Sequence, residues 1–128
     1  MAKIFVIHPE CINIDLRLNL HLQYRPHQLD VLSQIKTITK NARNLVVIDD
    51  YDLENTPKDG DVYLLEEGPT RLVAGCIVRK DEAIFIGAYT EKCVSEAANV
   101  ARRAGAIVTI NRKLTVPLDP RLYSEILK

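Results

Sequence analysis

The chain has 128 residues, a length typical of one domain, so residues 1–128 are expected to fold as a single domain. Its 17 basic and 17 acidic residues cancel, which argues against a nucleic-acid-binding protein, and its apolar runs are far shorter than the roughly 18 residues of a membrane span. No signal-peptide pattern opens the chain, and three cysteines without a Cys-x-x-Cys pair favour free thiols, so we expect a cytoplasmic protein without membrane contact.

Short apolar segments alternate with amphipathic segments along the chain. Lys3–Ile7 is apolar on both faces, which predicts a buried strand. Leucines at every second position from Leu16 to Leu22 favour an exposed strand or ribbon within the ambiguous stretch Glu10–Tyr24. The later elements are a helix at Pro26–Ala42, strands at Leu45–Ile48 and Val62–Leu65, a strand or short helix at Leu72–Val78, a strand at Ala83–Gly87, a helix at Glu91–Ala104, a strand at Ala106–Ile110 and a last helical turn within Arg121–Leu127.

This alternation of buried strands and amphipathic helices predicts a three-layer α/β domain with a Rossmann-like, mostly parallel sheet flanked by helices. Ile4–Ile7, Leu45–Ile48 and Ile84–Ile86 should be neighbouring parallel strands, because each is apolar on both faces. Sites in such sheets gather at the carboxyl ends of the strands, so the residues that follow each predicted strand are the candidates for function.

The segment from Gly87 to Cys93 carries the most specific chemical signal. A strand leads into a glycine turn, and Thr90 as N-cap would place Cys93 in the first turn of the next helix. Amide hydrogens and the helix dipole at that position lower the pKa of a thiol and could hold an oxyanion. A free cysteine can equally be a small buried side chain that packs a helix against the sheet, and the residues alone leave both alternatives open.

Residues Glu82–Thr109 resemble the nucleophile region of the isochorismatase-like cysteine hydrolases. That family has an apolar strand, a glycine, a threonine and then Cys-Val, which opens an alanine-rich helix ending at glycine. The segment Phe5–Glu10 resembles the first strand of the family, and Val31–Arg43 with the strand after it is similar to the first helix and second strand. The positions that match are Gly87, Thr90, Cys93, Val94, Ala97, Ala98, Ala101, Gly105 and Val108.

The resemblance implies an isochorismatase-like fold and a hydrolase with Cys93 as nucleophile. The family also uses an aspartate at the end of the first strand, where this chain has His8, and an upstream lysine, for which Lys80 is the nearest candidate. A neutral imidazole can deprotonate a thiol, so Cys93 and His8 form a candidate catalytic dyad. The candidate substrate-binding residues follow the predicted strands and are Gly87, Tyr89, Thr90 and Asp49.

The acidic loop Asp49–Asp52 also follows a predicted strand. Two or three carboxylates there could hold Mg²⁺ for phosphoryl chemistry, but solvated turn residues explain the same loop. The glycine that a calcium loop needs is absent, and His21 and His27 have no cysteine beside them. The sequence therefore predicts no metal site and implies no cofactor.

Two functions remain open. The first is a small hydrolase that acts on an amide-like or vinyl-ether-like small molecule. The second is a non-catalytic α/β module that keeps the scaffold for binding or oligomerisation, which the incomplete triad and the short chain favour. The alternating leucines from Leu16 to Leu22 predict a homo-oligomer in which this face packs on another copy.

Overall fold

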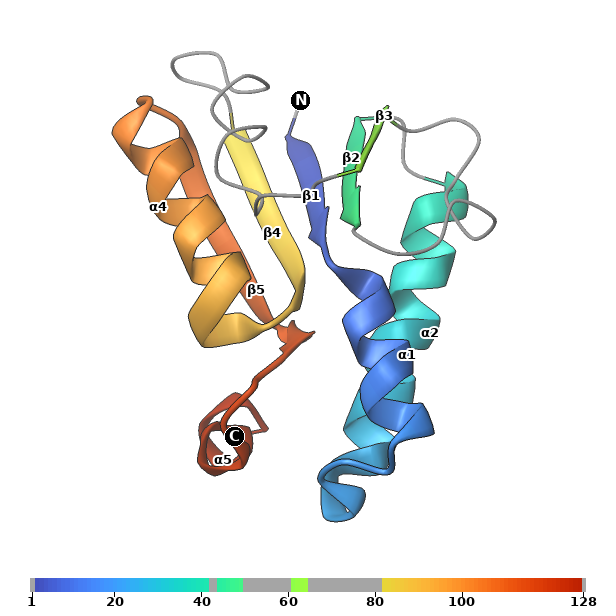
Figure 1. Cartoon of the computed structure of the whole chain (residues 1–128). Coiled ribbons are helices and arrows are strands. Elements are labelled where there is room, and N and C mark those ends of the chain that lie inside the picture. Colours follow the sequence, from blue (N-terminus) through green and yellow to red (C-terminus); the bar gives the residue numbers. More distant parts are fainter. Residues whose placement is uncertain (1, 42–43, 50–60, 65–81, 128) are drawn as a thin grey trace.

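The computed structural model describes residues 2–41, 44–49, 61–64 and 82–127, in which strands and helices alternate (Figure 1). The strands are β1 (Lys3–Ile7), β2 (Leu45–Asp49), β3 (Asp61–Leu64), β4 (Glu82–Ala88) and β5 (Ile107–Val116). The helices are α1 (Pro9–Arg17), α2 (Arg25–Asn41), α4 (Ser95–Arg103) and α5 (Tyr123–Ile126), with 3-10 turns at Leu22–Tyr24 and Pro120–Leu122 and a π-helical turn at Thr90–Val94.

The described strands form one parallel sheet in the order β3-β2-β1-β4-β5. β1 is central and pairs with β2 on one side and with β4 on the other. α1 and α2 pack against one face of the sheet and α4 against the opposite face (Figure 1). The predicted three-layer α/β fold is therefore confirmed, as is the prediction of three neighbouring parallel strands at Ile4–Ile7, Leu45–Ile48 and Ile84–Ile86.

Each face of the sheet has its own apolar core, because successive side chains of a strand point to opposite faces. Val6 belongs to the core under α1 and α2, whereas Phe5 and Ile7 belong to the core under α4. Phe5 stacks on Phe85 of the neighbouring strand with ring centroids 4.8 Å apart. The helical spacing of Val94, Ala97, Ala98, Ala101 and Ala104 predicts one apolar face for the helix Glu91–Ala104; the first four of these side chains are buried against this core, whereas Ala104 is exposed.

The prediction of an exposed strand or ribbon within Glu10–Tyr24 is wrong, because the chain forms α1 directly after β1. Pro9 occupies the first turn, where its fixed φ suits a helix. Glu10 is buried in the same turn, and the buried residues Ile12, Asp15 and Leu16 follow helical spacing. The leucine alternation continues past the end of α1, so it is not a strand pattern. Leu18, Leu20 and Leu22 are 63%, 42% and 62% exposed in the connection to α2.

Most of the remaining predicted elements are found close to their expected places. α2 covers the predicted helix, the last helical turn is α5, and β5 extends to Val116, beyond the predicted strand Ala106–Ile110. The segment Leu72–Val78 lies outside the described residues. Within the described ranges, none of the helices combines the length and the apolar character needed to cross a membrane.

At Gly87 the backbone of β4 lies close against the backbone of β1. The φ of Gly87 is +112°, and a Cβ atom there would collide with the carbonyl oxygen of Ile7, its partner in the sheet register. The pairing of β4 with β5 shifts register between Phe85 and Gly87. A glycine is therefore required at this point for both conformational and steric reasons.

We expect Gly87→Ala to lower the free energy of unfolding by more than about 3 kcal/mol, since the methyl group meets backbone that cannot move aside. Urea denaturation measures this loss. Gly105→Ala is the matched control, because Gly105 also has positive φ (95°) but is exposed after α4, so its loss should be about 1 kcal/mol. Equal losses in the two variants would contradict the steric argument.

Candidate functional site

Several of the predicted site residues lie close together at the carboxyl edge of the sheet. Ile7 is in register with Ile48 of β2 and with Gly87 of β4. His8, Asp49 and Ala88 each follow one of these paired residues, so their backbones lie side by side at the strand ends. The chain leaves β1 toward one face of the sheet and leaves β4 toward the other, which is the arrangement that opens a crevice in doubly wound folds.

His8 is a buried polar residue at the end of the central strand. It is 6% exposed and has left-handed backbone angles, φ 44° and ψ 54°. Its carbonyl oxygen accepts the amide hydrogen of Cys11 at 3.0 Å, which starts α1. A histidine in this conformation is strained, and such strain concentrates at functional sites.

Cys93 lies in the π-helical turn Thr90–Val94 and is half-buried against the core under α4. The prediction that Thr90 caps the helix is wrong: Tyr89 precedes the turn, and its carbonyl oxygen accepts the amide hydrogens of Lys92 and Val94 at 3.1 and 3.2 Å. The regular helix begins only at Ser95. Cys93 therefore lies before α4, in a turn with its own backbone geometry, rather than inside the first turn of a regular helix.

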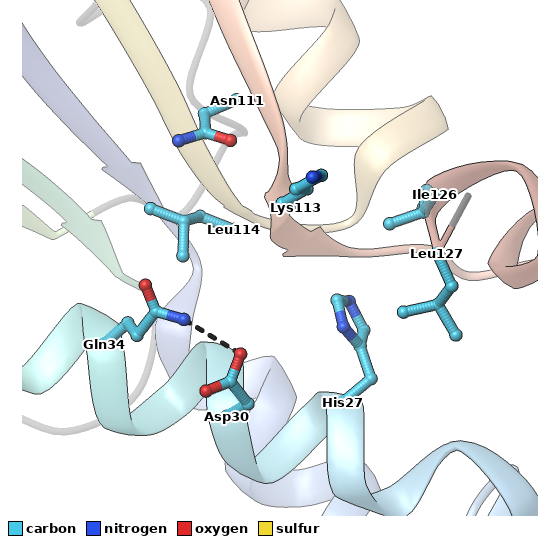
Figure 2. Close-up of a pocket in the computed structure, with 8 residues that line it drawn as sticks. All are labelled: His27, Asp30, Gln34, Asn111, Lys113, Leu114, Ile126 and Leu127. Carbon is cyan, nitrogen blue, oxygen red and sulfur yellow. Dashed lines mark hydrogen bonds between the residues drawn. The ribbon is translucent and has the colours of Figure 1, made fainter.

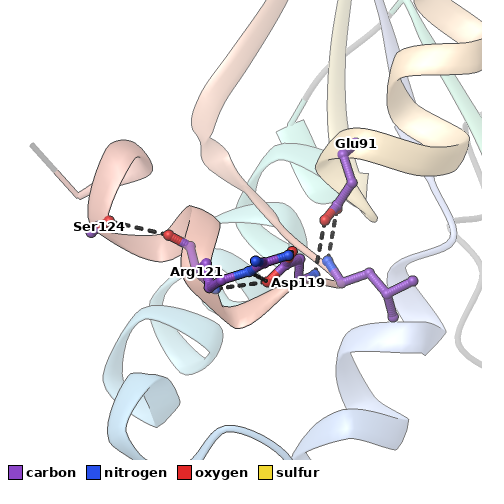
Figure 3. A network of polar contacts seen from close by, with 5 residues as sticks. Glu91, Asp119, Arg121 and Ser124 are labelled. Carbon is purple, nitrogen blue, oxygen red and sulfur yellow. Dashed lines mark hydrogen bonds and ion pairs between the residues drawn. The ribbon is translucent and has the colours of Figure 1, made fainter.

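Three consecutive side chains before Cys93 bind three different elements. The Tyr89 hydroxyl donates to Oδ1 of Asp15 on α1 at 2.9 Å. The Thr90 hydroxyl donates to Oγ1 of Thr115 on β5 at 2.7 Å. The two carboxylate oxygens of Glu91 accept the amide hydrogens of Leu118 and Asp119, each at 2.8 Å (Figure 3).

These contacts define the roles of two predicted substrate-binding residues. Tyr89 and Thr90 lie at the strand end as expected, but both hydroxyls donate within the protein. Beyond the turn, the Arg121 guanidinium donates to both carboxylate oxygens of Asp119 and lowers the pKa of that carboxyl to about 2 (Figure 3). The segment whose amide hydrogens bind Glu91 is thus itself held by the ion pair between Asp119 and Arg121.

Asp15 is the functional candidate that the sequence did not reveal. It is 3% exposed, and burial raises its pKa, an effect opposed by the hydrogen bond from Tyr89 and by the nearby His21. Burial and the neighbouring Asp15 also raise the pKa of Tyr89, so its hydroxyl keeps its proton. The helical spacing of Ile12 and Leu16 after Pro9 was the available signal that Asp15 faces the core.

Two cavities border β5. One of about 270 Å³ lies directly against the Thr90–Val94 turn and is lined by Thr90, Glu91, Ser95, Ile110, Arg112, Leu122, Glu125 and Ile126. The other, of about 570 Å³, lies between α2, β5 and α5 and is lined by His27, Asp30, Gln34, Asn111, Lys113, Leu114, Ile126 and Leu127 (Figure 2). In the larger cavity Gln34 donates to Asp30 at 2.8 Å, and Nε2 of His27 donates to the Thr115 carbonyl oxygen at 2.9 Å. Only the smaller cavity touches the candidate nucleophile turn.

Of the acidic loop Asp49–Asp52, the structure describes the backbone of Asp49 at the end of β2, and residues 50–52 lie outside the described part of the chain. The segment Glu66–Gly68, a candidate because it follows the predicted strand Val62–Leu65, also lies outside the described part. In the ranges that are described, no group of three or more His, Cys, Asp or Glu side chains is arranged to hold a metal ion.

Comparisons of the chain with protein-family models, with curated proteins and with solved structures find no match. The arguments for a function therefore come from the chemistry and geometry of its own residues.

The buried carboxyl group of Asp15 makes the stability of the protein depend on pH. Its folded pKa is raised above the ordinary value of 3.8, so its contribution to stability is fully present below pH 3.8 and is lost as the pH rises through the folded pKa. Asp15→Asn keeps an oxygen that can accept the Tyr89 hydroxyl but cannot ionise. We therefore expect this variant to gain stability relative to the wild type as the pH rises from 3 to 7, measured by urea denaturation at each pH. Asp30→Asn on the exposed face of α2 is the control, and a pH-independent difference for Asp15→Asn would contradict the argument.

Proposed function

We propose that this chain is a small cysteine hydrolase of the isochorismatase-like kind, with Cys93 as nucleophile and His8 as general base. The observation that carries the proposal is the register of β1 with β4, which pairs Ile7 with Gly87. His8 and the segment leading to Cys93 therefore start from neighbouring strand ends. The strained, buried backbone of His8 supports the same assignment.

The reaction that fits these groups is hydrolysis of an amide. His8 accepts the thiol proton of Cys93, and the thiolate attacks the carbonyl carbon of the substrate. The carbon–nitrogen bond then breaks, the imidazolium of His8 donates its proton to the departing nitrogen, and an acyl thioester remains on Cys93. Water attacks the thioester, its proton passes through His8 to the leaving sulfur, and the carboxylic acid is released. The amide hydrogens of Lys92 and Val94 donate to the Tyr89 carbonyl oxygen, so the candidate donors to the oxyanion are the other amide hydrogens of the Thr90–Val94 turn.

The substrate of such an enzyme is a small molecule, of the amide-like or vinyl-ether-like class. A cavity of about 270 Å³ lies beside the turn; the charged residues of its lining are Glu91, Arg112 and Glu125, whereas Cys93 and His8 do not line it. The balanced net charge, and three cysteines without a Cys-x-x-Cys pair, support a cytoplasmic location without nucleic-acid binding.

Alkylation by iodoacetamide tests the assignment of Cys93. We expect Cys93 to be labelled before Cys11, with a pH midpoint below the roughly 8.5 of a free thiol. Cys11 is a matched control, since it is also half-buried and also lies in the first turn after a strand. His8→Ala should raise the midpoint of Cys93 or slow its labelling and leave Cys11 unchanged. Mass spectrometry of the labelled peptides measures each site.

Hydrolysis is tested by ammonia release from a panel of small carboxamides. Cys93→Ala should abolish release, whereas Cys11→Ala should retain it. Release that survives in Cys93→Ala rejects the hydrolase, and so does a Cys93 that iodoacetamide reaches only after unfolding.

A specific observation also favours the second candidate, an oligomerisation module. Leu18, Leu20 and Leu22 expose much of their apolar surface in one short connection between α1 and α2. Three exposed leucines in five residues are typical of a surface that another chain covers. The two functions are compatible, because this connection is separate from the Thr90–Val94 turn in the sequence.

Self-association predicts that the wild type sediments as an oligomer at micromolar concentration. The double variant Leu18→Ser, Leu22→Ser should sediment as a monomer, because it removes the apolar surface without changing a buried side chain. Leu118→Ser, at another exposed leucine, is the control. A strictly monomeric wild type would refute the oligomerisation module.

A further inference from the structure

The contact between Tyr89 and Asp15 differs from the other two tethers of the segment before Cys93. Its acceptor is a carboxyl group on a residue that is only 3% exposed, the hydrogen bond itself is partly buried, and it joins α1 to the end of β4. Tyr89 also supplies the carbonyl oxygen that accepts the amide hydrogens of Lys92 and Val94. The side chain of Tyr89 is therefore bound to α1, and its carbonyl oxygen binds the residues immediately before and after Cys93.

A buried carboxylate is an inefficient way to stabilise a fold. Removing it from water costs more free energy than one hydrogen bond to the charged group returns. The raised pKa of Asp15 agrees with this balance, because burial disfavours the charged form more than the hydrogen bond from Tyr89 favours it. An apolar side chain among Ile12 and Leu16 would pack on the core without this cost. What an apolar side chain cannot do is fix the hydroxyl of Tyr89 in one direction.

We propose that Asp15 and Tyr89 are positioning residues that hold the Thr90–Val94 turn, and with it the thiol of Cys93, in its reactive geometry. The carboxylate oxygen of Asp15 fixes the Tyr89 ring, the ring fixes the peptide that follows β4, and the Tyr89 carbonyl fixes the amides of Lys92 and Val94. This role rests on the proposed function of Cys93 as nucleophile. Neither residue is assigned a contact with the substrate.

The test compares the rate of Cys93 alkylation in variants of the full chain, together with carboxamide hydrolysis. Tyr89→Phe removes the donor and Asp15→Leu removes the acceptor, and each should slow alkylation of Cys93 about tenfold and raise its pH midpoint. The double variant should be no slower than either single variant, because both remove the same contact. Asp15→Asn keeps an acceptor oxygen and should restore a rate close to that of the wild type. Tyr24→Phe, at another half-buried tyrosine, should leave the rate unchanged.

The direction of the change separates positioning from simple destabilisation. A destabilised protein opens more often, so Cys11 and Cys93 would both react faster, whereas loss of positioning slows Cys93 alone. A Tyr89→Phe variant with the wild-type alkylation rate overturns the positioning role and leaves the hydrolase intact. Additive effects in the double variant, or an Asp15→Asn variant as slow as Asp15→Leu, also overturn it. A wild-type Cys93 that reacts no faster than Cys11 overturns the proposed function and the positioning role together.

Discussion

The close approach of the β1 and β4 backbones at Gly87 is the constraint on which the described structure depends. A side chain at that position would collide with the Ile7 carbonyl, so the two central strands pair this tightly only around a glycine. Their pairing in turn brings the start of α1 and the turn before α4 to the same edge of the sheet, on opposite faces. The candidate site and both apolar cores are consequences of this one contact.

The strands were predictable because a strand that is buried on both faces appears in the sequence as a short run without polar residues, as in Ile4–Ile7. α4 was predictable because its alanine stripe repeats at helical spacing. α1 was not, since Leu16 continues into exposed leucines of the connection and together they imitate the alternation of a strand. Periodicity over a few residues cannot show where one element ends, so the end of α1 could not be predicted.

Local pattern also limited what could be predicted of the candidate site. His8 follows one apolar strand, Gly87 ends another and Cys93 comes shortly after it, so their place at the carboxyl edge of the sheet could be inferred from sequence. Asp15 could not be placed beside Tyr89, because the two residues are 74 positions apart and a single pair of polar residues carries no periodic signal. The same holds for Glu91, whose carboxylate accepts the backbone amide hydrogens of Leu118 and Asp119. Its position in the sequence does not distinguish it from an acidic side chain that is exposed to solvent.

The separation of Asp15 and Tyr89 along the chain has a consequence for biosynthesis. α1 emerges from the ribosome well before β4. The carboxylate of Asp15 therefore remains hydrated until β4, which pairs with β1, has been synthesised. Its dehydration requires β4 to pair with β1 and bring Tyr89 against α1, and β5 joins the sheet only afterwards, which makes closure of the α1 face a late event. A nascent chain that stops before residue 89 would therefore carry an open, partly wetted core on this side of the sheet.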